Sequence, residues 1–273
     1  MLSKIKKLLL LFSFCTLLSC SQYQKILSKG SIIEKNKAAE KYYSEGEYRK
    51  ALNLFEQIMP AYKVKPQAQR VVFFFANSYF QTKDYYLAAY QFENFRKSFP
   101  NSDRLIEASF MEAKSHYMLS PKYTLYQKET YEAIDKLQIF INKYPQSEFA
   151  EEANIYVQEL QGKLEKKTFE ISKQYYTIRD YRAAIKSIDN FIIDNPGTVF
   201  REEALYYKFL SSYELAINSV IGKKLERLKS VDKVFNNIKR YYPETIFETQ
   251  LNEKIEIIKN MIVFVIKNPC ILC

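Results

Sequence analysis

A pattern of small and large apolar residues recurs four times along this chain and constrains its fold more than any other feature. Each copy places an alanine before two bulky apolar residues at i+4 and i+7, so that all three lie on one face of a helix. The small alanine lets a neighbouring helix approach closely. We therefore predict repeated, closely packed helices. The copies are Ala51, Phe55 and Ile58; Ala88, Phe92 and Phe95; Ala133, Leu137 and Phe140; and Ala184, Ile188 and Phe191.

Prolines mark where these helices end. Pro100, Pro145 and Pro196 follow three copies of the pattern, and a proline cannot continue a helix comfortably. A hydroxyl residue stands two positions after each of these prolines and also after Pro243. We expect each hydroxyl oxygen to cap the next helix by accepting a backbone N–H. These residues are Ser102, Ser147, Thr198 and Thr245.

Glycine is scarce, with 5 residues in a chain of 273. So few glycines cannot supply the tight hairpins of an all-β protein or the phosphate loops of nucleotide-binding folds. Self-similar helix pairs are typical of an α-solenoid, and the order of small, aromatic, alanine and proline positions resembles tetratricopeptide repeats. We predict an all-α solenoid over residues 31–267, made of about five helix pairs and a C-terminal capping helix. The pairs are expected at 31–62, 68–100, 103–145, 148–196 and 199–243, with an insertion near 120–127, and the capping helix at about 247–267.

The first 19 residues are predicted to be a lipoprotein signal peptide. Three lysines precede an apolar run that begins at Leu8, as in secretory signals. The run is shorter than the roughly 20 residues that a membrane span needs. Leu17-Leu18-Ser19-Cys20 resembles a bacterial lipobox, which implies that Cys20 carries the acyl chains of the mature protein, and residues 20–30 would form a lipid-anchored linker. The alternatives are an ordinary Cys20 thiol beside a cleaved signal, or a short membrane anchor over 5–18.

The sequence contains no recognisable catalytic or metal-binding motif. His116 is the only histidine, and Cys270 and Cys273 form a C-x-x-C pair without a second pair of ligands. We expect residues 268–273 to be an incidental tail, with a chance disulfide in an oxidising compartment as the alternative. We therefore predict no enzymatic activity, cofactor or metal. The net charge is +10, but the basic residues are spread along the chain with no run of five. This pattern favours solvated helix faces over nucleic-acid binding.

The tetratricopeptide register places one set of side chains on the inward face of the first helix of each pair. In the first two pairs this set is aromatic, with amides, one acid and one cation. It can bind an apolar, aromatic-rich peptide and pair the peptide's carboxylate with Arg70. In the alternative, Phe73 and Phe80 are buried between helices. The candidate groove residues are Asn36, Glu40 and Tyr43 in the first pair and Arg70, Phe73, Asn77 and Phe80 in the second.

A lipobox cysteine followed by about five such repeats resembles the BamD family of outer-membrane assembly lipoproteins. The resemblance covers nearly the whole mature chain. It is carried by Cys20, by the junctions Phe99-Pro100-Asn101-Ser102 and Tyr144-Pro145-Gln146-Ser147, and by Glu202-Glu203-Ala204-Leu205-Tyr206.

Membership of this family implies a lipid anchor on the periplasmic face of the outer membrane. It also implies binding to the barrel subunit BamA and to other Bam lipoproteins. The N-terminal repeats are implied in recognising the C-terminal segments of unfolded outer-membrane proteins, and the C-terminal repeats in binding BamA. The tail after Pro269 matches no family feature.

Two other protein classes remain open. One is a periplasmic tetratricopeptide coordinator of the Tol–Pal envelope system, although that family normally has an N-terminal coiled coil and a signal without a lipid. The other is a glycan-capturing surface lipoprotein. Those proteins are typically much longer and bind sugars on tryptophan platforms, whereas this chain has no tryptophan.

Overall fold

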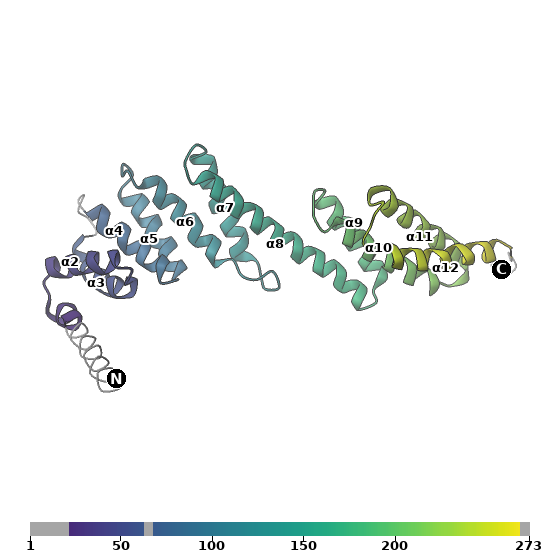
Figure 1. Cartoon of the computed structure of the whole chain (residues 1–273), viewed down its shortest axis with the longest axis horizontal. Coiled ribbons are helices and arrows are strands. Elements are labelled where there is room, and N and C mark those ends of the chain that lie inside the picture. The colour runs from purple at the N-terminus through teal and green to yellow at the C-terminus, as the bar shows by residue number, and fades with distance from the viewer. Residues whose placement is uncertain (1–21, 63–67, 268–273) are drawn as a thin grey trace, which may run out of the picture. The chain divides into compact units, whose positions relative to one another are not determined.

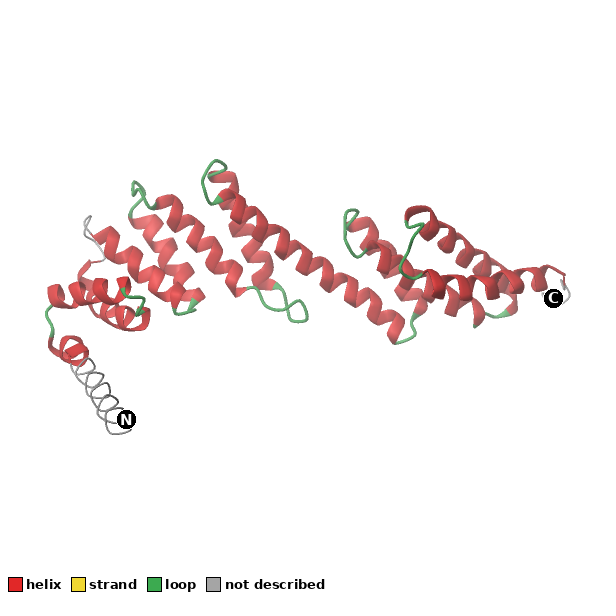
Figure 2. Ribbon diagram, viewed as in Figure 1, coloured by secondary structure: helices red, strands yellow, loops and turns green. Residues whose placement is uncertain are grey.

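The computed structural model describes residues 22–62 and 68–267, and all the regular elements in these two ranges are helices (Figure 2). A short helix over residues 22–29 precedes the longer ones. Figure 1 shows their order along the chain. They are α2 (Ile32–Ser44), α3 (Tyr48–Tyr62), α4 (Gln69–Gln81), α5 (Tyr85–Ser98), α6 (Leu105–Leu119), α7 (Lys128–Lys143), α8 (Ala150–Thr177), α9 (Tyr181–Asp194), α10 (Arg201–Ile217), α11 (Ile221–Tyr241) and α12 (Glu248–Lys267).

The predicted all-α repeat is confirmed. Consecutive helices contact each other from α2 through α7 and again from α9 through α12. α2 also contacts α4, and α10 contacts α12, so the first helices of neighbouring pairs meet directly. The chain therefore builds its core by stacking helix pairs, as expected for a solenoid.

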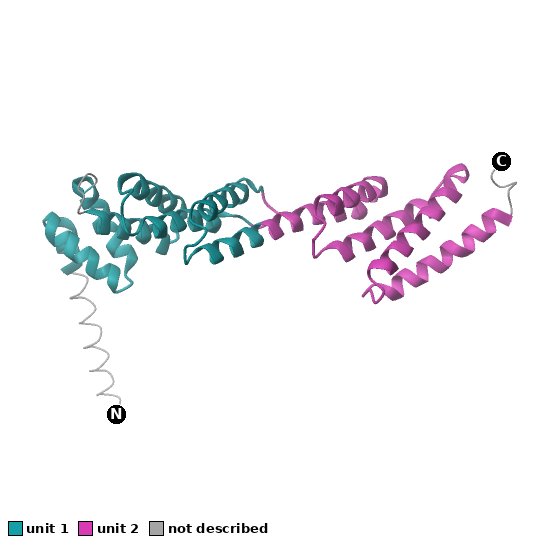
Figure 3. Ribbon diagram, turned by 90° about the horizontal axis from the view of Figure 1, so that it is seen from above, with its two compact units in different colours: residues 1–121, 126–160 teal, residues 122–125, 161–273 magenta. Residues whose placement is uncertain are grey.

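The stacked helices form two compact units (Figure 3). Among the described residues, the first unit comprises 22–62, 68–121 and 126–160, and the second comprises 122–125 and 161–267. The long helix α8 contributes residues to both units. Each unit has its own apolar clusters, centred on residues such as Phe55 and Phe92 in the first and Phe209 and Ile255 in the second.

The recurring apolar pattern forms the centre of the helix pairs. None of its twelve residues is more than 3% exposed, and its four alanines are fully buried. Because a buried aromatic or leucine side chain contributes about 1.5–3 kcal/mol, this pattern is sufficient to select the helical register in each pair.

The hydroxyl residues that follow the prolines do not cap the next helix, and this prediction was wrong. α6 begins at Leu105, three residues after Ser102. The Ser102 N–H donates to the Phe99 carbonyl at 3.1 Å, and the Leu105 N–H donates to the Ser102 carbonyl at 3.0 Å. Two successive turns therefore separate α5 from α6, and Ser102 lies at the point where they join. Its hydroxyl accepts the Arg104 N–H at 3.2 Å, but Arg104 is itself the residue that precedes the helix, so this bond lies in the turn.

The same arrangement recurs at later junctions. The Thr198 hydroxyl accepts a hydrogen bond from the Phe200 N–H at 3.2 Å, and the Thr245 hydroxyl accepts one from the Phe247 N–H at 3.3 Å. The Ser147 hydroxyl is buried and has no hydrogen-bond partner among the described residues. The side chains of Ser102, Thr198 and Thr245 therefore stabilise the turns and not the helix ends.

Aspartates cap two of the second helices instead. The carboxylate of Asp84 accepts the Leu87 N–H at 3.4 Å, and that of Asp180 accepts the Ala183 N–H at 3.1 Å. The residue before each aspartate has a left-handed backbone, with φ of 67° at Lys83 and 64° at Arg179. Gly46 takes the same conformation before α3, with φ of 77°. A left-handed residue thus links the two helices in three of the pairs.

The segment expected to be a linker ends in a helix that packs on the first unit. Tyr23 is buried, lies edge-on to Tyr42 with 5.4 Å between ring centroids, and accepts a hydrogen bond from Asn53 at 3.3 Å. A side chain at Gly30 would place its Cβ 2.5 Å from the Ile26 carbonyl oxygen. Glycine is therefore required where this helix turns toward α2.

The predicted insertion and capping helix both lie where expected. Residues 120–127 connect α6 to α7, and Lys167 donates to the carbonyls of Tyr123 and Leu125 at 3.0 and 2.8 Å. α12 buries Leu251 and Ile258 in the cluster that it shares with α10 and α11. No described helix is both long and apolar enough to cross a membrane.

Candidate peptide-binding surface

The first helices of the first two pairs are joined by an ion pair. Arg70 of α4 lies 3.2 Å from the Glu40 carboxylate of α2, and the Asn36 amide donates to the same carboxylate at 3.5 Å. The Arg70 side chain is 66% exposed, whereas that of Glu40 is 26% exposed. The structure thus brings three predicted groove residues together, and Arg70 keeps donors that face solvent.

Tyr43 and Asn77 also meet at this surface. The Asn77 amide donates to the Tyr43 hydroxyl, and the Tyr43 ring stacks on Phe74 with 4.1 Å between centroids and 15° between planes. Burial raises the pKa of Tyr43, so the phenol stays neutral. The side-chain oxygens of Asn36 and Asn77 are buried and accept no hydrogen bond from the described residues. Because they are buried, these two oxygens are not open to a ligand at this surface.

The remaining two candidates lie differently. Phe73 is 2% exposed and packs edge-on against Phe92 and Phe95, so its ring belongs to the core and is not open to a ligand. Phe80 is partly buried and lies 5.3 Å from Tyr85, centroid to centroid.

The structure adds a pocket beside these residues that the sequence analysis did not identify. It has a volume of about 450 Å³ and is lined by Gln69, Arg70, Phe74, Ser102, Asp103 and Arg104. The guanidinium groups of Arg70 and Arg104 lie 5.3 and 5.6 Å from the centroid of the Phe74 ring. We call this the Arg70–Arg104 pocket.

The chemistry of the pocket suits a carboxylate that adjoins an aromatic or apolar group. Guanidinium groups bind carboxylates through paired N–H donors, and they also pack on aromatic faces. Arg104 forms an ion pair with Glu107 at the limiting distance of 4.0 Å. Arg104 is therefore the more weakly paired cation of the pocket, because Arg70 already has Glu40 at 3.2 Å. Asp103 adds one carboxylate to the lining.

Arg104 could have been found by aligning the repeats, because Phe149 and Phe200 occupy its position at the next two junctions. Phe149 stacks on Phe110 at 4.8 Å and Phe200 stacks on Phe169 at 5.3 Å, each with 13° between planes. Arg104 instead places its guanidinium 4.5 Å from the Phe73 ring centroid. The aromatic stack is thus replaced by a cation at one junction, and this junction adjoins the predicted groove.

The later junctions share a cluster that we call the Lys–Glu clasp, defined by Lys114, Glu152 and Tyr156 in the first unit and by Lys173, Glu203 and Tyr207 in the second. The ammonium-to-carboxylate distances are 2.7 Å for Lys114 and 2.9 Å for Lys173.

The clasp shifts the pKa values of its members. Hydrogen bonds from Lys114 and Tyr156 hold the pKa of Glu152 below its ordinary value. Burial alone would lower the pKa of Lys114, but hydrogen bonds to Glu152 and Tyr156 raise it. Both groups remain charged and paired, so this cluster links helices and offers a ligand little unpaired charge.

The histidine and the cysteines considered in the sequence analysis do not form a catalytic or metal site in the described part of the chain. Burial, followed by repulsion from Lys136, lowers the pKa of His116, so the imidazole is neutral at pH 7. In the described part of the chain, no group of three or more potential ligands lies close enough to hold a metal ion. Cys20, Cys270 and Cys273 lie outside the described residues.

The chain is similar to known outer-membrane lipoproteins. A family model named YfiO and described as "Outer membrane lipoprotein" matches residues 34–185 and 163–264. The outer membrane protein assembly factor BamD of Rickettsia prowazekii (strain Madrid E) is 24% identical over 217 residues, which cover 73% of this chain and 85% of that protein. Because the family model spans most of the chain, this protein belongs to the YfiO, or BamD, family of outer membrane lipoproteins.

Proposed function

We propose that this protein is a lipid-anchored adaptor that brings unfolded outer-membrane proteins to a BamA-type barrel insertase. Its lipidated residue is Cys20, and it faces the periplasm. It acts by binding and catalyses no covalent step. Its family membership supports a role in outer-membrane assembly, and its N-terminal surface supports the capture of a peptide.

The observation that carries the substrate half of this proposal is the Arg70–Arg104 pocket. Two guanidinium groups lie over one aromatic ring, and that of Arg104 has only a 4.0 Å ion pair within the protein. A peptide that ends in an aromatic residue places its α-carboxylate on the arginines and its ring against Phe74.

The C-terminal repeats are proposed to bind the insertase, and other Bam lipoproteins are proposed as further partners. Acyl chains restrict the protein to the membrane that holds the barrel, and a second contact then forms at high effective concentration. Several contacts of moderate affinity then hold the substrate strand near the insertase, and no single contact has to bind tightly.

Affinity purification from membranes tests the adaptor role. The tagged protein should recover a large outer-membrane barrel that has periplasmic domains. Recovery of peptidoglycan-linked proteins without such a barrel would overturn the assignment and favour an envelope coordinator.

Peptide binding tests the pocket separately. A peptide with a C-terminal phenylalanine and a free carboxylate should bind the full mature chain, and Arg104→Gln should weaken binding about tenfold, as expected for the loss of a charge-assisted hydrogen bond. Arg49→Gln is the matched control, because Arg49 is exposed on α3 in the same unit and lines no part of the pocket. Equal binding of the free acid and the C-terminal amide would rule out carboxylate recognition.

A further inference from the structure

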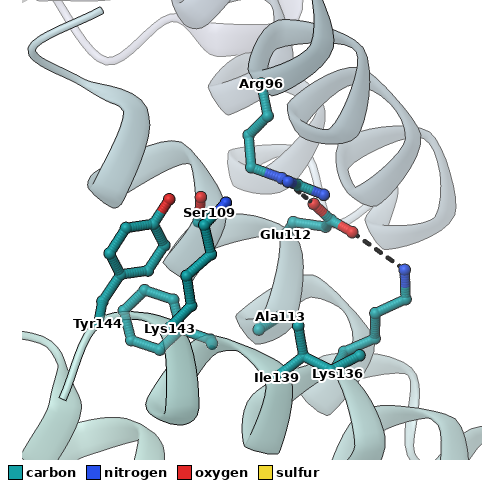
Figure 4. A pocket seen from close by; sticks show the side chains of 9 residues that line it. Arg96, Ser109, Glu112, Ala113, Lys136, Ile139, Lys143 and Tyr144 are labelled. Atoms are coloured by element: carbon teal, nitrogen blue, oxygen red, sulfur yellow. Dashed lines mark hydrogen bonds and ion pairs between the residues drawn. The ribbon is translucent and has the colours of Figure 1, made fainter. Parts of the chain in front are cut away.

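A second cavity lies in the first unit, between α5, α6 and α7 (Figure 4). It has a volume of about 150 Å³, enough for several water molecules or one small polyatomic group. Three cations, Arg96, Lys136 and Lys143, line it together with one carboxylate, that of Glu112. It shares no lining residue with the Arg70–Arg104 pocket.

Glu112 fixes two of these cations. Its carboxylate is 5% exposed and lies 2.6 Å from Arg96 Nε and 3.1 Å from Lys136 Nζ. Figure 4 shows the two cations approaching the carboxylate from opposite sides. Arg96 belongs to α5, Glu112 to α6 and Lys136 to α7. Glu112 therefore fixes one cation from each neighbouring helix at the cavity wall.

The charge of the cavity is not balanced. Three cations against one carboxylate leave an excess of two positive charges among the lining residues. The pKa of Glu93 is lowered by its hydrogen bond to Lys97 and, to a smaller extent, by the charges of Lys136 and Arg96. Its carboxylate is already paired with Lys97 at 2.9 Å, so it does not neutralise the cavity. Among the described residues, Lys143 has no carboxylate within ion-pair distance, and its ammonium lies 5.3 Å from the Tyr144 ring centroid.

Tyr144 provides an independent indication of a ligand. Tyr144 lines the cavity, and its hydroxyl is buried and has no hydrogen-bond partner among the described residues. A buried hydroxyl without a partner is unfavourable, and a bound acceptor would satisfy it. Ser109 cannot serve as the main donor, because its hydroxyl already donates to the Leu105 carbonyl at 2.7 Å.

We propose that this cavity binds one small oxyanion group, a carboxylate or a phosphate. Lys143 and the Tyr144 hydroxyl donate to its oxygens, while Arg96 and Lys136, oriented by Glu112, supply the positive field. A purely structural role, in which Glu112 joins α5, α6 and α7 through its ion pairs, explains the positions of Arg96 and Lys136. It does not account for the Tyr144 hydroxyl, which is buried without a partner at a cavity that the exposed Lys143 also lines.

Methyl NMR of the full mature chain tests this site. The Ile139 side chain lines the cavity, so its δ-methyl signal should shift saturably when inorganic phosphate or N-acetylaspartate amide is added. Lys143→Gln should weaken binding of the tighter ligand about fivefold, and Tyr144→Phe about threefold. Both variants should keep the wild-type helical circular dichroism.

Lys128→Gln is the control, because it removes the same charge from the same helix roughly 22 Å away along α7. Lys128 is 63% exposed and pairs with Glu132 at 3.6 Å. Tighter binding of N-acetylaspartate amide identifies an acidic side chain of a partner protein as the source of the group, and tighter binding of phosphate identifies a phosphate. The absence of a saturable Ile139 shift with both ligands, or an equal loss of binding in Lys128→Gln, would overturn the proposal.

Discussion

At the scale of single residues, three positions perform the same task with different side chains. Gly46, Lys83 and Arg179 each take a left-handed backbone conformation between the two helices of a pair. Glycine adopts this conformation without steric cost, whereas a residue with a Cβ loses about 1–2 kcal/mol. The turn between the helices, and not the side chain, requires the left-handed backbone, because the side chains of Lys83 and Arg179 are exposed.

Lys83→Gly should therefore stabilise the first unit. Relief of the left-handed strain exceeds the extra backbone entropy of a glycine in the unfolded chain, which leaves a net gain of about 0.5–1 kcal/mol. Urea unfolding followed by circular dichroism measures this gain as a higher midpoint. Gly46→Lys provides the reverse control and should lower the midpoint. A lower midpoint for Lys83→Gly would show that the lysine side chain contributes more than its backbone strain costs.

His116 should make the stability of the first unit depend on pH between about 5 and 7. Burial, then repulsion from Lys136, lowers its pKa in the folded state. The unfolded chain thus binds a proton more readily, and folding stability falls as the pH drops through the unfolded value of about 6.5. Because His116 is the only histidine, His116→Asn should flatten the change in unfolding free energy between pH 7.0 and 5.5. The same pH dependence in both proteins would assign the effect to other groups.

At the scale of helices, the sequence was sufficient for the helix pairs but not for the exposed surface. Alanine and aromatic spacing identified the buried faces because burial leaves a period that can be counted. Neighbouring residues on a helix differ by about 100° in direction, so a register shifted by one residue exchanges buried and accessible side chains. Phe73 was assigned to the groove, yet it is Phe74 that stacks on Tyr43 and lines the pocket. Arg104 was missed because it belongs to a turn, where no period applies.

The Lys–Glu clasp should couple α6 to α8 energetically. Lys114→Met and Glu152→Gln each remove one partner of a 2.7 Å ion pair. Because the Glu152 side chain is 42% exposed, screening by solvent limits the coupling free energy in a double-mutant cycle to about 0.5–1 kcal/mol. Urea unfolding of the two single variants and the double variant measures it. The coupling should shrink in 1 M NaCl. Strictly additive single effects would mean that the pair contributes nothing.

At the scale of the whole molecule, the proposed function divides the work between an anchor and two units of helix pairs. In this proposal the lipid anchor determines where the protein acts, and the helix pairs determine what it binds. The N-terminal pairs present the Arg70–Arg104 pocket, and the second unit is proposed to bind a different partner. This division predicts that location and binding can be separated by changes at the N-terminus alone.

Replacing residues 1–19 with the cleavable signal of a soluble periplasmic protein, together with Cys20→Ala, should release the chain from membranes. Under the proposed function the acyl chains of Cys20 hold the protein on the membrane, so their loss should release it. Cell fractionation should place the variant in the periplasmic extract, with unchanged helical circular dichroism. Recovery of the barrel in affinity purification should fall by about tenfold or more, because the contacts with it no longer form at high effective concentration. Retention in carbonate-washed membranes would show that an element other than Cys20 anchors the protein.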